Sequence, residues 1–323
     1  MYGNTLSEMY CKKNLWVVRN KVVRCDNDCV DGVCKKETLL TCQEQNGNIC
    51  ESYQVCNGEV LSASNTNRCC LGQCKIPSSF DWRNRHGENW NSPVKDQGSA
   101  VTCRSFGPTG VFEAQINLYF NQHLDLNLSE QMLEDCMFRD FLSETTVCRS
   151  KEGYDLSYCK TQKWGLPDEL CDTYAERISQ FPTVNTCTLN YVCDDWSLRV
   201  WKNSDYKWYA IHPNDRTGDD ILGRVSSAYP DDIKRYLIKN GPMSSGLVSW
   251  NHDMALEGYE TGVNGEVVWI FKNSLGTQSG EDGYIKTRAN DFEYGTELND
   301  PIQPQGPFTP PLNRSYWPIG FIN

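Results

Sequence analysis

The sequence predicts an α+β fold in which a small disulfide-rich domain precedes a larger domain with helices first and strands later. Ten of the 17 cysteines lie in the first 76 residues, so this segment differs from the rest of the chain. Apolar residues then recur at helical spacing between Cys103 and Phe120, which predicts an amphipathic helix. After Gly241, short apolar runs separated by glycine and asparagine predict strands. The chain therefore divides into three parts, a cysteine-rich domain, a larger domain and a proline-rich tail: residues 1–76, 77–300 and 301–323.

The N-terminal segment is expected to be held together by disulfides. It contains few apolar residues, and a segment of this size needs cross-links or a metal when its core is small. Structural zinc sites favour paired cysteine knuckles with histidine, whereas residues 1–76 have no histidine and contain the adjacent pair Cys69 and Cys70. We therefore expect disulfide bonds, no metal site and a protein that works in an oxidising compartment.

Charge and hydropathy exclude two classes of partner. The chain has 42 acidic and 31 basic residues, a net charge of -11, so binding to nucleic acid is not expected. Its densest apolar run, Val267 to Phe271, is far shorter than the roughly 18 residues of a membrane span. The first residues lack the charged start and apolar stretch of a secretion signal. We expect a secreted or cell-surface protein whose signal peptide is not seen in this chain.

The elements of the larger domain follow in order. Pro108 and Gly110 lie inside the helix expected from Cys103 and are expected to interrupt it, because an interior proline costs about 3 kcal/mol. Ser129 is expected to cap a second helix, with acidic and amide side chains in its first turn. Strands are expected at three places: residues 254–259, 267–271 and 283–287.

Four residues from distant parts of the chain carry the chemistry of acyl transfer. A thiol becomes a strong nucleophile as a thiolate, which a helix N-terminus and a neighbouring imidazolium favour, and Cys103 lies where a helix is expected to begin. His252 opens a later strand, and Asn273 follows on the next strand pair, placed to orient the imidazole by a hydrogen bond. Gln97 offers a side-chain N–H to an oxyanion, beside the backbone N–H of Cys103.

With these residues in place, the segment from about 77 to 295 resembles the papain-like cysteine peptidases. Each matching stretch alone is a weak signal, and together they are specific. Besides the residues around Cys103, His252 and Asn273, the matching stretches are Phe80-Asp81-Trp82-Arg83, Pro93-Val94-Lys95-Asp96-Gln97-Gly98, Leu128-Ser129-Glu130-Gln131-Met132-Leu133-Glu134-Asp135-Cys136, Gly241-Pro242 and Gly280-Glu281-Asp282-Gly283-Tyr284-Ile285.

The resemblance implies a two-lobed fold, with a helical lobe and a β-barrel-like lobe on either side of a substrate cleft. It implies an endopeptidase that hydrolyses protein or peptide substrates without a metal or organic cofactor. In this family pattern Cys103 attacks the carbonyl carbon, His252 transfers the proton, Asn273 orients His252 and Gln97 binds the oxyanion. Gly153 is expected to line the substrate cleft.

The cysteine count agrees with a single free thiol. If Cys103 is the free thiol, sixteen cysteines remain, enough for five disulfide bonds in the N-terminal domain and three in the larger domain. The family's cysteine three residues before the nucleophile is Ala100 here, so its usual bridge is absent. By resemblance Cys136 pairs with Cys187. Cys148 must then find its partner in a set of three: Cys159, Cys171 and Cys193.

Substitutions near the nucleophile leave a second function open. Val101 replaces a family glycine and adds bulk close to the substrate, while Arg104 and Leu275 replace tryptophans. The alternative is a catalytically silent relative that acts as an extracellular binding or adhesion module. Residues 1–76 do not resemble the family's helical propeptide, so they are either an adhesion or targeting module or an intramolecular regulator of the cleft.

Overall fold

The structure is a computed structural model of the chain. Its described backbone covers residues 10–12, 15–18, 21–24, 29–30, 33–34, 39–137, 165–175, 192–209, 229–247, 250–288 and 292–302. Within these, burial is described for residues 39–134, 165–175, 192–203, 230–247 and 250–288.

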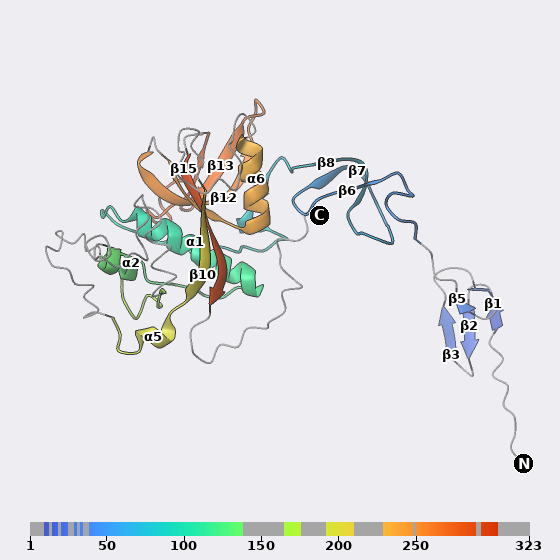
Figure 1. The fold of residues 1–323 in the computed structure, drawn as a ribbon, viewed down its shortest axis with the longest axis horizontal. Coiled ribbons are helices and arrows are strands. Elements are labelled where there is room, and N and C mark those ends of the chain that lie inside the picture. The colour runs from blue at the N-terminus through green and yellow to red at the C-terminus, as the bar shows by residue number, and fades with distance from the viewer. Residues whose placement is uncertain are drawn as a thin grey trace, which may run out of the picture. The chain divides into compact units, whose positions relative to one another are not determined.

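The chain forms two compact units. The smaller comprises residues 1–51 and 56–75, and the larger comprises residues 52–55 and 76–323. Figure 1 draws the smaller unit in blue and the larger one from cyan to red. The chain passes from the smaller to the larger unit between residues 75 and 76, and the domain boundary expected between residues 76 and 77 stays a prediction.

The smaller unit consists of short antiparallel strands. β1, β2 and β3 form one sheet in chain order, β4 pairs with β5, and β8 lies between β6 and β7 in a second three-stranded sheet. The bounds are β1 Tyr10–Lys12, β2 Leu15–Val18, β3 Lys21–Arg24, β4 Cys29–Val30, β5 Val33–Cys34, β6 Asn48–Ile49, β7 Val55–Leu61 and β8 Cys69–Lys75.

Disulfide-bonded cysteines form the buried interior of residues 39–75 of this unit. Three disulfides cross-link its described part: Cys42–Cys69, Cys50–Cys74 and Cys56–Cys70. Between residues 39 and 75 the buried side chains are all cysteines: Cys42, Cys50, Cys69 and Cys70. The predicted disulfides are therefore confirmed for these six cysteines, while the side chains of Cys11, Cys25, Cys29 and Cys34 lie outside the described residues.

The larger unit is built on an antiparallel sheet with the strand order β10-β15-β11-β12-β13-β14, and β9 also pairs with β12. The three predicted strands fall within or overlap β12, β13 and β14. Strand β15 includes Pro301 and Ile302, where the tail was expected to begin. The bounds are β9 Phe80–Asp81, β10 Lys202–Tyr209, β11 Met243–Leu247, β12 His252–Thr261, β13 Val267–Lys272, β14 Tyr284–Thr287 and β15 Phe292–Ile302.

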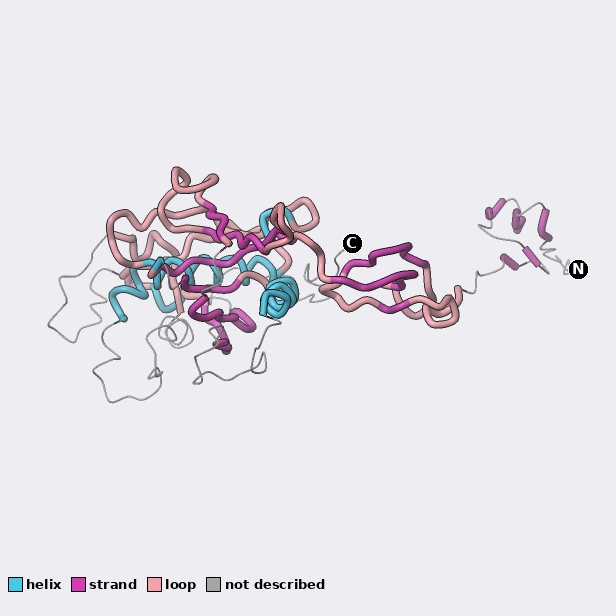
Figure 2. The backbone as a smooth tube through the Cα atoms, turned by 90° about the horizontal axis from the view of Figure 1, so that it is seen from above, coloured by secondary structure: helices cyan, strands magenta, loops and turns pink. Residues whose placement is uncertain are grey.

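Helices pack close to this sheet, as Figure 2 shows from above with helices in cyan and strands in magenta. The Oγ atom of Ser129 accepts a hydrogen bond from Met132 N at 3.1 Å, as predicted for a cap. No helix in the described ranges has the length and hydropathy required to cross a bilayer. The helix bounds are η1 Trp82–Asn84, α1 Cys103–Phe120, α2 Gln131–Met137, α5 Trp196–Arg199 and α6 Tyr229–Asn240.

Helix α1 runs without a break from Cys103 to Phe120, so the expected interruption is wrong. Pro108 lies inside the helix, and almost every side chain of α1 is buried. Close packing offsets the lost hydrogen bond. A Cβ on Gly107 would lie 3.3 Å from the backbone nitrogen of Met254 in β12. Gly107 therefore lets the helix approach strand β12 closely.

Two apolar clusters form the core, and β12 contributes to both. Met254 and Leu256 belong to one cluster, with aromatic side chains such as Trp82 and Trp269, whereas Ala255 belongs to the other, with side chains such as Phe112 of α1. Successive side chains of a strand point to opposite faces. The strand that begins with His252 is therefore anchored on both sides.

A fourth disulfide joins Cys171 to Cys193 in the larger unit. It uses two of the three expected partners of Cys148 and leaves Cys159 from that set. The expected pair of Cys136 with Cys187 lies outside the described side chains, as do Cys148 and Cys159.

Candidate active site

The structure brings the four predicted residues to the region where α1 meets the sheet. Cys103 is the first residue of α1 and His252 the first residue of β12. Asn273 follows β13, which pairs with β12 so that Ala255 faces Lys272. Gln97 lies in the segment that leads into α1 and is 5% exposed. Gly153, the fifth predicted residue, lies outside the described residues.

The Asn273 side chain contacts the imidazole of His252. Its Oδ1 atom lies 2.7 Å from His252 Nε2 and accepts a hydrogen bond from the Ser274 backbone N–H at 2.8 Å. A backbone N–H can only donate, so Oδ1 is the acceptor in both bonds and His252 Nε2 carries a proton. The Asn273 amide nitrogen is held in turn by Ser279 Oγ at 3.0 Å. The neutral imidazole therefore has Nδ1 as its basic nitrogen.

Cys103 carries the one free thiol among the described cysteines, and it is buried. Burial raises the pKa of this thiol above its ordinary value, because a charged sulfur is disfavoured away from water. Backbone hydrogen bonds from Asp253 and Arg104 act in the opposite direction, as does the positive charge of Arg104. Asp253 directly follows His252, so the Cys103 sulfur lies beside the start of β12. The buried thiol needs a base to become an effective nucleophile.

Hydrogen bonds hold both polar atoms of the Gln97 side chain. Ser274 Oγ donates to Gln97 Oε1 at 2.5 Å, and Gln97 Nε2 donates to the Ala100 carbonyl oxygen at 2.7 Å. The amide nitrogen carries two protons, and the Ala100 bond uses one of them. The second N–H of Gln97 makes no hydrogen bond among the described residues.

A short antiparallel pairing joins the segment that contains Gln97 to the segment that follows Asn273. Gln97 N donates to the Ser274 carbonyl oxygen at 2.8 Å, and Gly276 N donates to the Lys95 carbonyl oxygen at 3.1 Å. The groups expected to bind the oxyanion and to orient the imidazole are therefore attached to each other through the backbone.

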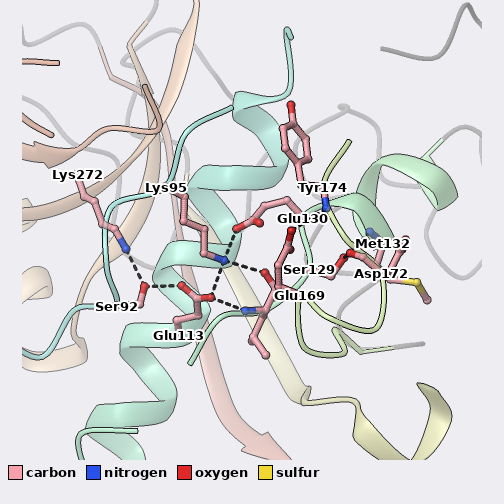
Figure 3. Close-up of polar contacts among 11 residues, drawn as sticks. Ser92, Lys95, Glu113, Ser129, Glu130, Met132, Glu169, Asp172, Tyr174 and Lys272 are labelled. Atoms are coloured by element: carbon pink, nitrogen blue, oxygen red, sulfur yellow. Dashed lines mark hydrogen bonds and ion pairs between the residues drawn. The ribbon is translucent and has the colours of Figure 1, made fainter. Parts of the chain in front are cut away.

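A buried cluster of charged side chains lies beneath this site, with its polar contacts drawn in Figure 3. Lys272 Nζ donates to Ser92 Oγ at 2.7 Å, and Ser92 Oγ donates to the carboxylate of Glu113. Lys95 Nζ lies 2.8 Å from both Glu113 Oε1 and Glu130 Oε1. The cluster links α1, the start of α2 and the end of β13. A cavity of about 20 Å³ between these side chains also touches Asn273.

Burial raises the pKa of two carboxyl groups near this cluster. Burial raises the pKa of Glu130 to about 8, opposed by the neighbouring ammonium of Lys95. Burial also raises the pKa of Glu257, on β12, to about 8, opposed by Lys272. The motifs around Lys95, Glu130 and Lys272 did not predict that these residues form one buried cluster. Only Lys272 stands in an apolar stretch, after Val267 to Phe271, where its charge was an available signal.

The substituted positions near the nucleophile differ in exposure. Val101 is 80% exposed, and Leu275 is 42% exposed. Arg104 lies with its Nε 3.9 Å from the carboxylate of Asp253.

The geometry of the described residues offers no thiolate site for a metal in the smaller unit. Three sulfurs lie within 4.8 Å of one another there, those of Cys50, Cys70 and Cys74. Each of them is in a disulfide, so it lacks the thiolate that zinc binds.

Comparisons with known proteins identify the family of this chain. Residues 76–300 match the family described as papain family cysteine protease. The chain belongs to this family. A viral cathepsin of Spodoptera exigua nuclear polyhedrosis virus is 30% identical over 223 residues, which are 67% of this chain and 58% of the relative. Procathepsin L of Felis catus is 29% identical over 226 residues, 66% of this chain and 60% of the relative.

The fold agrees with these sequence relationships. A solved structure from work on the mite allergens Blo t 1 and Der p 1 has a TM-score of 0.50 and 19% sequence identity, covering 84% of this chain and 84% of that chain. The predicted papain-like fold is therefore confirmed. The chain spans about three fifths of the length of the curated papain-family relatives it matches.

Proposed function

We propose that this protein is a cysteine endopeptidase with Cys103 as its nucleophile and His252 as its general base and acid. The observation that carries the proposal is the 2.7 Å contact of His252 Nε2 with Asn273 Oδ1, beside the free thiol of Cys103. This contact leaves His252 Nδ1 as the nitrogen that takes the thiol proton. Membership of the papain family supports peptide bonds as the substrate.

The reaction proceeds in two halves. The thiol proton of Cys103 moves to His252 Nδ1, and the sulfur attacks the carbonyl carbon of the peptide bond. The C–S bond forms while the carbonyl electrons move to the oxygen, which binds the Cys103 N–H and the second Nε2–H of Gln97. His252 then gives the proton to the leaving amine, and the C–N bond breaks. Water activated by His252 hydrolyses the resulting thioester and restores the thiol.

The oxidised cysteines support work outside the cytosol. Four disulfides in the described part of the chain fit an oxidising compartment, as secreted and cell-surface proteins meet. Protein or peptide substrates of that compartment are the proposed partners. The proposed reaction requires no metal or organic cofactor.

Hydrolysis of fluorescently labelled casein tests the assignment of roles. Cys103→Ser and His252→Ala should abolish turnover. Gln97→Ala should only reduce it, by about 10²- to 10³-fold for one lost oxyanion donor. Equal activity in the three variants would contradict the proposal.

A covalent label tests the nucleophile directly. An epoxysuccinyl peptide alkylates activated thiolates, and mass spectrometry should locate it on Cys103 in the unmodified chain but on neither variant. Labelling that requires removal of residues 1–76 would make that segment an intramolecular regulator of the cleft. Labelling in neither form would favour the silent binding module.

A further inference from the structure

Tyr174 connects the two ends of the loop that leads from Gln97 to the nucleophile. Its hydroxyl donates to the Gln97 backbone carbonyl oxygen at 2.8 Å and lies 2.8 Å from Thr102 Oγ1. A carbonyl oxygen only accepts, so the single hydroxyl proton of Tyr174 is directed to Gln97 and Thr102 donates to the Tyr174 oxygen. Gln97 and Thr102 flank residues 98–101. One hydroxyl group therefore holds both ends of this loop.

The contact also changes what Thr102 does for helix α1. A threonine immediately before a helix usually accepts a hydrogen bond from a backbone N–H of the first turn. Thr102 occupies that position, but its side chain makes no capping hydrogen bond. Its hydroxyl bonds Tyr174 instead. The hydroxyl is thereby kept away from the N–H groups at the start of α1, where the oxyanion is expected to bind.

Tyr174 is itself held from two sides. Its backbone N donates to Glu169 Oε1 at 2.7 Å. Its ring packs edge-to-face on Phe106 of α1, with centroids 4.8 Å apart and planes at 89°. Figure 3 shows Tyr174 above Glu169 and Glu130, at the side of α1. The hydroxyl therefore has a fixed position relative to the helix that carries Cys103.

We propose that Tyr174 is a positioning residue for the oxyanion hole. It acts through Gln97 and Thr102 and sets the distance between the Gln97 side-chain donor and the Cys103 N–H. This inference rests on the proposed peptidase function. Oxyanion donors act mainly in the transition state, so loss of the Tyr174 hydroxyl should reduce kcat and leave KM nearly unchanged.

The test compares Tyr174→Phe with Tyr259→Phe. Tyr259 also donates its hydroxyl to a backbone carbonyl, that of Pro77 at 2.9 Å, but in the core. Each variant loses one oxygen atom and the hydrogen bond that it donates to a backbone carbonyl, and Tyr174→Phe also loses the hydrogen bond from Thr102. Two rates are measured: turnover of the peptidyl-aminocoumarin that the unmodified chain cleaves best, and alkylation of Cys103 by iodoacetamide. Alkylation displaces iodide, forms a thioether and creates no oxyanion.

We expect Tyr174→Phe to lower kcat about tenfold, the rate equivalent of one hydrogen bond, with KM and alkylation within about twofold of the unmodified chain. Tyr259→Phe should change neither rate. Thr102→Val, which removes the other partner, should lower kcat as Tyr174→Phe does.

Three results would overturn the inference. Turnover of Tyr174→Phe equal to that of Tyr259→Phe would show that the hydroxyl does not act on the hole. A parallel fall in turnover and alkylation would show that the loss concerns the thiol or the fold. Absence of turnover in the unmodified chain would overturn the proposed function, and this inference with it.

Discussion

The two units of this chain use cysteine in opposite ways. Between residues 39 and 75 of the smaller unit, every cysteine is in a disulfide and the buried side chains are cysteines, while Leu40 and Val60 remain exposed. In the larger unit, aromatic and aliphatic side chains such as Trp269 and Phe271 fill two clusters, and Cys103 keeps its thiol free. A segment too small to bury a core is stabilised by covalent bonds. A unit with a large core can leave a sulfur for chemistry.

The largest effect is expected from removing part of the apolar core. Phe271→Ala should destabilise the larger unit by about 3–5 kcal/mol, because a fully buried ring leaves a cavity. Thermal unfolding followed by tryptophan fluorescence measures the loss. Hydrogen exchange in residues 39–75 should stay as in the unmodified chain. Val263→Ala, at a side chain that is 98% exposed, is the control.

Removing a disulfide should destabilise the smaller unit and leave the larger unit unchanged. The double change Cys50→Ser with Cys74→Ser opens a loop of 24 residues and should destabilise the smaller unit by about 3 kcal/mol. Hydrogen exchange in residues 39–75 should rise sharply. The unfolding temperature of the larger unit should not change. If the larger unit were destabilised to a similar extent, the two units would not be stabilised independently. Cys103→Ser, which removes no disulfide, should destabilise neither unit.

A smaller effect, on kcat, is expected from removing the hydrogen bonds that Asn273 makes with His252 and Ser279. Asn273→Ala should lower kcat about 10²-fold, because the imidazole loses the partner that sets its orientation. Ser279→Ala removes the 3.0 Å bond to the Asn273 amide but keeps the His252 contact, so its loss should be less than tenfold. Steady-state kinetics on one peptide substrate compare the two. Equal losses would mean that Asn273 does not act through His252.

The smallest effect on stability is expected from Glu257, a buried carboxyl group of the larger unit. Burial raises the pKa of Glu257 from 4.5 to about 8, so its carboxyl group stays protonated in the folded protein at pH values where it ionises in the unfolded chain. Its contribution to stability is fully present below pH 4.5 and is lost as the pH rises through 8. Glu257→Gln should therefore change little at pH 4 and add about 1–2 kcal/mol at pH 8.

Unfolding in urea at several pH values measures this difference. Glu59→Gln, at an exposed position of the smaller unit, is the control. A gain from Glu257→Gln that is the same at pH 4 and pH 8 would exclude titration of Glu257 as its cause.

Residues inside short motifs were predictable from the sequence. Cys103, His252, Asn273 and Gln97 were assigned from stretches whose local pattern is tied to their chemistry, and the structure brings all four to the same region. The helix cap at Ser129 was predictable for the same reason, since a cap depends on neighbours within three residues.

Features that depend on packing were not predictable. Pro108 breaks a helix by local rules, yet α1 continues because its faces are buried among the sheet and other segments. Tyr174 bonds Gln97 across 77 positions of sequence, so no motif includes both. The pairing of Cys56 with Cys70 rather than with the adjacent Cys69 depends on the register of β8 against its neighbours, which the sequence alone leaves open.

The pairing of the Gln97 segment with the Ser274 segment has a consequence for the timing of activity. The two residues are 177 positions apart, so the proposed oxyanion donor Gln97 lacks its Ser274 hydrogen bond until the ribosome has added Ser274. At about 5–20 residues per second, synthesis of that interval takes roughly ten seconds or more. In the proposed peptidase, a nascent chain that already contains Cys103 would lack this hydrogen bond during that interval, so its activity would begin only after Ser274 has been added.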